Sequence, residues 1–469
     1  MNTPILDMLQ KISLSGVRFC MPGHKGKPGA FGKTAHEFDI TELPGADNLY
    51  MPEGVIRDSQ KLHADFTRAG QSWFLVNGSS TGVHAAMLSV LAPGDKVIVA
   101  RDMHLSAVHG LILADAQPVF LCPKNRHPEM PGVVTPQDVR DAIKAHPDAR
   151  AIYLTYPNYY GMCCDLNAIC AIAHSAGKKV ICDAAHAAAF DFSPLMPVSP
   201  AAAGCDIWVC SLHKTLPAMN QCATLSIGET TRLTPNVVQS RLNMLQTTSP
   251  SYVLLASCDY ALAYMREKGK NALGAAVALV EDNIRKIEAI SGYRVVTKDV
   301  PPLSGAFDRD ILKLVIDVTD RGVSGFGVAK TLQKQGIFIE SADSSSILLL
   351  CTVADGKEDF DRLRGVLSRI KGANYHIKRT KPDEELSRIY AAKLAVPMRQ
   401  AAFAPRRNIP MIGAVGEISA VCVGAYPPGI PVILPGQAIT YGMVDAIARM
   451  RQAGYDIFGT DGSIEVADV

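Results

Sequence analysis

Two reactive side chains in the middle of this chain each follow an apolar run typical of a buried strand. Asp183 comes directly after the apolar residues 180–182, and Lys214 ends a short stretch that begins after residues 207–210. A lysine amine can form a Schiff base with an aldehyde cofactor, and a carboxylate can keep a pyridine nitrogen protonated. The pair therefore predicts a site for pyridoxal phosphate (PLP), anchored on Lys214.

Each of these residues also has an ordinary alternative. Lys214 could be a surface lysine, the usual place for that residue type, and Asp183 could cap the N-terminus of a helix. Their shared position favours the cofactor roles, because ligands of α/β sheets bind beyond the carboxyl ends of the strands.

A phosphate site is predicted nearby, in a run of small polar residues between a predicted strand and a predicted helix. The run includes Gly78, Ser79 and Ser80. Main-chain N–H groups and the helix N-terminus would attract an anion there. Because Ser and Gly also mark ordinary turns, the prediction depends on Ser211 and His213 joining the same cradle.

The histidines have more than one interpretation. His104 could stack its ring on PLP or be a hydrogen-bonded loop residue, and His186 could contact the substrate or stabilise its turn. His24, His84 and His109 are expected to be structural. Since no set of His, Cys and Asp residues has the spacing of metal ligands, no metal site is predicted.

Six short apolar runs predict the strands that position these side chains. They lie at residues 73–76, 97–100, 118–121, 151–154, 180–182 and 207–210. Helical stretches, for example at 81–91 and 136–145, alternate with them. Runs that are apolar on both faces and separated by helices predict an α/β fold with a mainly parallel sheet covered on both sides.

Four regions are expected along the chain. They are an irregular Gly- and Pro-rich N-terminal arm (residues 1–70), a large PLP-binding domain (71–295), a small α+β domain (296–372) and a C-terminal region (373–469). A long helix is predicted at 252–290. The small domain is expected to alternate strands and helices, at 310–319, 327–335, 346–351 and 357–370. The polar segment 371–385 is typical of a linker.

Composition narrows the class of protein. A chain of 469 residues is expected to form more than one domain, and 48% hydrophobic with 20% charged residues argues against disorder. A net charge of +2 gives no reason to expect nucleic acid or membrane partners. Twelve cysteines without a CxxC pair, and no evident secretory signal, predict a reduced cytoplasmic setting.

Seven motifs occur in order along most of the chain. They are Pro22-Gly23-His24-Lys25-Gly26, Thr41-Glu42-Leu43-Pro44-Gly45, Pro52-Glu53-Gly54, Asn77-Gly78-Ser79-Ser80-Thr81, Ser211-Leu212-His213-Lys214, Thr247-Thr248-Ser249-Pro250-Ser251-Tyr252 and Tyr426-Pro427-Pro428-Gly429-Ile430-Pro431. Together they resemble the short form of the Orn/Lys/Arg decarboxylase family. The resemblance implies a fold-type I PLP enzyme of the aspartate-aminotransferase type, at least a homodimer, with its sites at the subunit interface.

The resemblance also implies individual roles. Lys214 would carry PLP, Asp183 would pair with the ring nitrogen and His104 would stack on the ring. The phosphate would be held by hydroxyl and imidazole groups, those of Ser79, Ser80, Ser211 and His213. From the neighbouring subunit, Thr247 or Thr248 would reach the same phosphate.

The chain departs from the family pattern at several positions. Leu105 stands where a lysine is usual, Ala184 replaces a glutamate, and Glu417 is an acid where a base is usual. Acids usual in the family are missing at Val421 and Gln437. Because a cationic side chain is best bound by carboxylates, these changes leave open whether the substrate is Lys, Arg, ornithine or another amino acid.

The predicted activity is PLP-dependent amino-acid decarboxylation of the Orn/Lys/Arg type, which releases CO2 and an amine and belongs to polyamine biosynthesis. Another fold-type I reaction, such as transamination or β-elimination, is an alternative because the early chemistry is shared. A second alternative is a catalytically silent PLP-binding paralogue that regulates an active homologue, since a fold alone does not establish activity.

Overall fold

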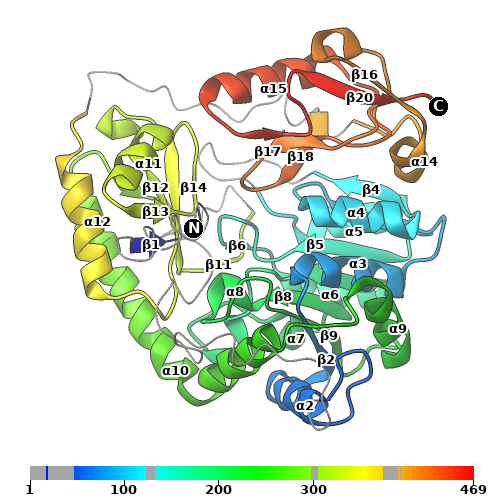
Figure 1. The fold of residues 1–469 in the computed structure, drawn as a ribbon, viewed down its shortest axis with the longest axis horizontal. Helices are drawn as coiled ribbons and strands as arrows, with labels where there is room; N and C mark the ends of the chain where they lie inside the picture. The colour runs from blue at the N-terminus through cyan, green and yellow to red at the C-terminus, as the bar shows by residue number, and fades with distance from the viewer. Residues whose placement is uncertain (1–16, 20–46, 123–131, 297–304, 373–388, 391) are drawn as a thin grey trace, which may run out of the picture.

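The computed structural model describes residues 17–19, 47–122, 132–296, 305–372, 389–390 and 392–469 (Figure 1). The motifs at 22–26 and 41–45, with His24, lie outside these residues. Most of the predicted N-terminal arm and of the linker at 371–385 also lies outside them. Among the described residues, no helix combines the length and the apolar character needed to cross a membrane.

A seven-stranded sheet organises the largest part of the molecule, in the order β2-β9-β8-β7-β5-β3-β4. Its strands are β2 (Ala69–Leu75), β3 (Lys96–Ala100), β4 (Gln117–Leu121), β5 (Ala151–Thr155), β7 (Lys179–Asp183), β8 (Ile207–Ser211) and β9 (Ala223–Gly228). Only β9 runs against its neighbours in this sheet. The prediction of six strands in a mainly parallel sheet is confirmed, and β9 is an addition to it.

Helices cover both faces of this sheet. They are α3 (Gly78–Val90), α4 (Leu105–Ala114) and α9 (Pro235–Leu245) on one face, and α5 (Pro136–Ala145), α6 (Leu166–Ser175) and α10 (Tyr252–Glu288) on the other. Successive strand residues serve opposite faces: Val97 and Val99 pack with the first group, whereas Ile98 packs with the second. The doubly covered sheet explains why its central strands are mostly apolar, with apolar residues on both faces.

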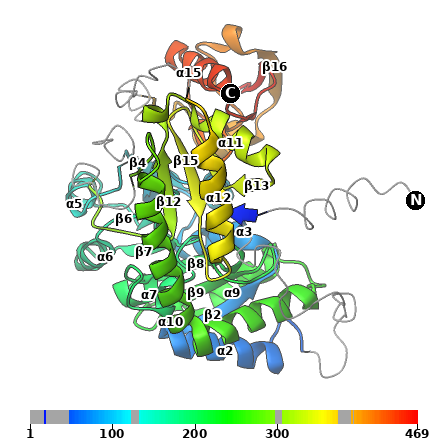
Figure 2. The same cartoon turned by 90° about the vertical axis from the view of Figure 1, so that its left-hand side faces the viewer.

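Helix α10 leads from the large sheet to a smaller unit, whose helix α12 packs against α10 (Figure 2). The unit contains β10 (Arg294–Val295), β12 (Lys313–Asp317), α11 (Gly325–Lys334), β14 (Ser341–Ala342), β15 (Ser346–Leu350) and α12 (Lys357–Arg369). Its four strands form an antiparallel sheet. The predicted elements at 310–319, 327–335, 346–351 and 357–370 are confirmed as β12, α11, β15 and α12.

The C-terminal unit has its own hydrophobic core and lies at the β4 side of the large sheet (Figure 1). It contains α14 (Met398–Phe403), β16 (Arg406–Pro410), β17 (Val423–Ala425), β18 (Ile430–Ile433), α15 (Tyr441–Ala453), β19 (Ile457–Phe458) and β20 (Ser463–Ala467). Strands β17, β18 and β19 form one small sheet, and β16 pairs with β20. The C-terminal unit is therefore a separately packed part of the chain beside the main sheet.

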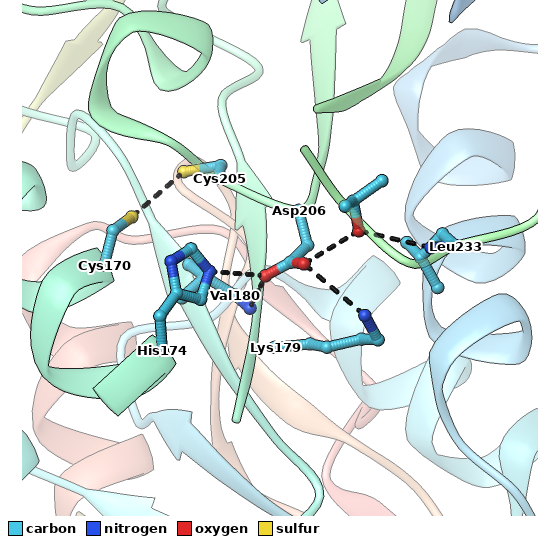
Figure 3. A network of polar contacts seen from close by, with 8 residues as sticks. Cys170, His174, Lys179, Val180, Cys205, Asp206 and Leu233 are labelled. Carbon is cyan, nitrogen blue, oxygen red and sulfur yellow. Dashed lines mark hydrogen bonds and ion pairs between the residues drawn. The ribbon is translucent and has the colours of Figure 1, made fainter. Parts of the chain in front are cut away.

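A buried carboxylate ties several elements together just before β8 (Figure 3). Asp206 accepts hydrogen bonds from Val180 N and His174 Nε2, both at 2.9 Å, and from Thr231 Oγ1 at 2.8 Å. Lys179 Nζ lies 3.5 Å away. Burial alone would raise the pKa of Asp206, but these donors outweigh burial and hold the pKa below its usual value.

We expect Asp206→Asn to lower the free energy of unfolding at pH 7 by about 1–3 kcal/mol, because an amide cannot accept hydrogen bonds at both ends. The folded pKa lies below the ordinary value of 3.8, so the carboxylate stabilises the fold above that value. Its contribution is lost as the pH falls through the folded pKa. The difference between wild type and variant in urea unfolding should therefore shrink below about pH 4.

The matched control for this experiment is Asp148→Asn, which breaks an exposed ion pair with Lys96. Exposed ion pairs contribute little to stability, so this variant should unfold like the wild type. Equal losses in the two variants, or a difference that stays constant with pH, would contradict the role of Asp206.

Candidate active site

The structure brings Asp183 and Lys214 together at the carboxyl ends of two adjacent strands. Asp183 ends β7 and lies opposite Val209 of the parallel strand β8. Strand β8 ends at Ser211, and the short helix α8 (Leu212–Thr215) that follows carries Lys214. Lys214 Nζ lies 3.2 Å from His186 Nε2. Burial lowers the pKa of Lys214, and the Asp183 carboxylate opposes this effect.

Asp183 is held by two hydrogen bonds, one to each carboxylate oxygen. Tyr153 on β5 donates its hydroxyl to Oδ2 at 3.0 Å, and Ala185 N donates to Oδ1 at 3.2 Å. Both Asp183 and Tyr153 are buried. No helix begins within residues 184–189, all of which are described, so the alternative of a helix N-cap is wrong. The carboxylate is instead fixed in a turn at the end of β7.

His186 is buried beside the lysine. Its ring meets the Tyr159 ring edge-on, at 5.7 Å between centroids and 90° between planes. Burial, with the charge of Lys214 adding to it, lowers the pKa of His186 well below its usual value. Nδ1 of His186 is buried without a hydrogen-bond partner among the described residues. A neutral imidazole with one unused nitrogen therefore faces the lysine amine.

His104 caps the N-terminus of α4. Its Nδ1 accepts a hydrogen bond from Ser106 N at 3.1 Å. Burial lowers the pKa of His104, and the nearby Asp183 carboxylate opposes this, with Lys214 acting in the same direction as burial. His104 is thus a hydrogen-bonded residue at the start of α4, and its stacking on the PLP ring stays a prediction.

The predicted phosphate cradle forms only in part. Ser211 Oγ and Ser79 Oγ lie 2.7 Å apart, joining the end of β8 to the first turn of α3. Gly78 has a positive φ of 76°, and its N–H is donated to Gln221 O at 3.0 Å. Gly78 therefore shapes the turn through its backbone conformation. His213 lies beside the cradle segment, with Nδ1 2.9 Å from Cys222 O.

Thr247 and Thr248 are exposed in the loop that follows α9. Within this chain the Thr247 hydroxyl accepts a hydrogen bond from Ser249 N at 3.2 Å. The preceding residue, Gln246, anchors the loop, because its Oε1 accepts from Val76 N at 3.1 Å. Val76 directly precedes the cradle segment, so the loop is fixed to the strand that leads into it.

Sequence reasoning missed a buried lysine that supports the site from the smaller unit. Lys313 on β12 is 1% exposed, and its Nζ donates to Tyr159 O at 3.0 Å and to Asn158 O at 3.4 Å. Burial lowers the pKa of Lys313 to about 7, and the Asp310 carboxylate opposes this. Burial also raises the pKa of Asp310 to about 6. A lysine inside an apolar strand pattern was the signal that could have revealed this residue.

Two of the positions that depart from the family pattern are used inside the C-terminal unit. Gln437 is completely buried; its Oε1 accepts from Leu434 N and its Nε2 donates to Ala392 O, each at 2.9 Å. Glu417 pairs with Arg407 at 3.1 Å. The polar side chains of Gln437 and Glu417 therefore both have partners within the C-terminal unit.

Comparison with known proteins agrees with this geometry. A family model described as "Orn/Lys/Arg decarboxylase, major domain" matches residues 3–303. The arginine decarboxylase of Bacillus subtilis (strain 168) is 32% identical over 98% of this chain and 96% of its own length. The chain belongs to the Orn/Lys/Arg decarboxylase family.

Two further comparisons describe this family member. The arginine decarboxylase of Halalkalibacterium halodurans is 31% identical to it over 95% of this chain and 92% of its own. The crystal structure of a Francisella novicida lysine decarboxylase superposes with a TM-score of 0.79 at 20% identity, over 100% of this chain and 79% of that chain. The protein is an amino-acid decarboxylase with the fold of type I PLP enzymes, and its family is PLP-dependent.

We expect Lys313→Met to destabilise the decarboxylase by roughly 3–5 kcal/mol, because it removes the cation that most lowers the pKa of the buried Asp310 carboxylate and the donor to Tyr159 O and Asn158 O. Adding Asp310→Asn to the same chain should recover part of this loss. Urea unfolding of the two single variants and the double variant forms a double-mutant cycle with an expected coupling of about 0.5–3 kcal/mol. Strictly additive losses would contradict an interaction between the two side chains.

Proposed function

We propose that this chain is a PLP-dependent arginine decarboxylase that converts the amino acid to CO2 and the corresponding amine. The observation that carries the proposal is the pair of side chains at the ends of β7 and β8, with Lys214 Nζ 3.2 Å from His186 Nε2. Support for arginine comes from the full-length relatives that bear this name.

The donor set of the site fits PLP. Lys214 offers a half-buried amine of lowered pKa, which is more readily neutral and therefore more nucleophilic toward an aldehyde. Asp183 offers a buried carboxylate with a fixed orientation, suited to a protonated pyridine nitrogen. When bound, PLP supplies an electron sink for the electron pair left behind as the Cα–carboxylate bond breaks.

The remaining roles follow from position. Ser79 and Ser211 offer hydroxyls at the N-terminus of α3, where main-chain N–H groups and the helix dipole favour a phosphate. Ser80 and His213 complete the proposed cradle, and His104 lies against the ring. The exposed loop that carries Thr247 and Thr248 fits a homodimer in which a second copy reaches the phosphate.

We assign the return of a proton to the product carbon to Lys214. Lys214 has a lowered pKa, so its ammonium form gives up a proton more easily than an ordinary lysine. His186 lies 3.2 Å from the Lys214 amine and is neutral because of its own lowered pKa. Its Nε2 can accept a hydrogen bond from Lys214 and so orient the amine that donates the proton.

An acid on the smaller unit supports a cationic substrate. Glu340 accepts a hydrogen bond from the Tyr159 hydroxyl at 2.9 Å, and Tyr159 packs on His186. The Glu340 carboxylate also raises the pKa of Lys214, against the larger effect of burial. A carboxylate this close to the site offsets the loss of the acids at Val421 and Gln437.

The region boundaries predicted from sequence are also part of this proposal. We assign the cofactor to residues 71–295, with the smaller unit at 296–372 and the C-terminal region at 373–469 completing the site around it.

A substrate panel tests the proposed function. Purified protein with PLP is offered arginine, lysine, ornithine and neutral and acidic amino acids, and labelled CO2 and amine are measured, with Lys214→Ala as the inactive control. Arginine should be turned over with the highest kcat/KM. Preference for another amino acid, or formation of a keto acid, would contradict the proposal. Cofactor binding without any turnover would favour the silent paralogue.

We expect Tyr153→Phe to lower kcat about tenfold or more with little change in KM, because Asp183 loses one of its two hydrogen-bond donors. Tyr156→Phe is the matched control, since Tyr156 is equally buried but donates its hydroxyl to Val198 O at 2.8 Å. Both variants should lose about 1 kcal/mol of stability. Equal kcat values in the two variants would contradict a role of the Tyr153 hydroxyl in positioning Asp183 for the chemistry.

A further inference from the structure

Arg101 is a completely buried arginine that binds a distant segment of the chain. It directly follows β3, and its Nη1 and Nη2 donate to Pro431 O at 2.8 Å and to Val432 O at 3.1 Å. The guanidinium also lies over the Tyr390 ring, at 4.7 Å from its centroid. Burying a guanidinium is unfavourable unless it is well bonded, so these contacts fix the start of β18 against the end of β3.

The segment that Arg101 holds runs along His104. Gly429, two residues before Pro431, accepts a hydrogen bond from Leu105 N at 2.9 Å. It has a positive φ of 79°, and a Cβ added there would stand 3.0 Å from His104 Nε2 and 3.1 Å from Cδ2. A Cβ would therefore push the ring by a few tenths of an ångström, and the positive φ also favours glycine. The backbone of the C-terminal unit packs directly on the imidazole.

The His104 ring is therefore fixed from two sides. On one edge Nδ1 accepts from Ser106 N at 3.1 Å, so a neutral ring carries its proton on Nε2. On the other edge Nε2 and Cδ2 face Gly429. Contacts within α4 orient one edge of the ring, and the segment held by Arg101 limits the other.

We propose that Arg101 is a positioning residue of the active site: it holds residues 429–432 so that Gly429 sets the tilt of the His104 ring over the cofactor. The proposal rests on the proposed function in one respect, which is the contact of His104 with PLP. With this role of Arg101, the C-terminal unit becomes part of the active site of its own chain. Arg101 holds the segment through its two hydrogen bonds, and Gly429 lets the backbone approach the ring because it has no side chain.

A second arginine provides the matched control. Arg399 on α14 also joins the C-terminal unit to the main sheet layer, because its Nη1 donates to Ile112 O and Leu113 O, each at 3.1 Å. These carbonyls lie at the opposite end of α4 from His104. Loss of Arg399 therefore weakens docking of the C-terminal unit without touching the His104 end of the helix.

The test compares Arg101→Met, Gly429→Ala and Arg399→Met by PLP dissociation constant, visible absorbance spectrum of the bound cofactor, kcat, KM and unfolding midpoint. Gly429→Ala needs the ring to move by a few tenths of an ångström, so it should weaken PLP binding and lower kcat by about tenfold. Arg101→Met releases the whole segment 429–432, so its effect on both quantities should be about 10- to 100-fold. Both variants should also shift the absorbance maximum. Arg399→Met should lower the unfolding midpoint and leave spectrum and kcat unchanged.

Gly429→Ala keeps the buried arginine and so tests the proposal even where Arg101→Met fails to fold. If both variants keep the wild-type spectrum, PLP affinity and kcat, as Arg399→Met should, the proposal is overturned. His104→Ala separates this failure from failure of the proposed function. If His104→Ala leaves the spectrum of the bound cofactor unchanged, the stacking role of His104 is refuted. If His104→Ala changes the spectrum but Arg101→Met and Gly429→Ala do not, only the positioning role of Arg101 is refuted.

Discussion

The parallel pairing of β7 with β8 is the constraint on which the rest of the structure depends. It places Asp183 opposite Val209 and carries the chain directly from Ser211 into the turn that holds Lys214. Two side chains 31 residues apart in sequence thereby meet at one edge of the sheet. Because strands of a parallel sheet all end at the same edge, residues from β2, β3 and β5 reach the same place.

Charged groups from two of the units surround that edge, and one of these groups binds the third unit. The large unit supplies Asp183, Lys214 and Arg101, and Arg101 donates to carbonyls of the C-terminal unit. The smaller unit supplies Lys313, under the Tyr159 turn. Buried charges are costly unless hydrogen bonds satisfy them. Burying these groups therefore lowers the stability of the fold, but their hydrogen bonds fix their positions. A site that must orient an amine and a carboxylate requires such fixed positions.

Much of the fold could be predicted from sequence because most strands of the doubly covered sheet contain continuous apolar runs. Strand β9 was missed because apolar and polar residues alternate in it, as in Leu225, Ser226 and Ile227, and it follows a helix and a turn. Of the residues predicted for the site, Lys214 lies 3.2 Å from His186 and Ser79 lies 2.7 Å from Ser211. The contacts of Lys313 and Arg101 were not predictable, since each depends on packing between units far apart in sequence.

The claim that this edge holds PLP through Lys214 has one direct test. Wild-type protein saturated with PLP is treated with sodium borohydride, which fixes the cofactor to the amine that carries it, and the digested chain is mapped by mass spectrometry. The label should appear on Lys214 and disappear from the Lys214→Ala chain. A label on Lys313, a buried lysine near the site, or on any other lysine would contradict the account.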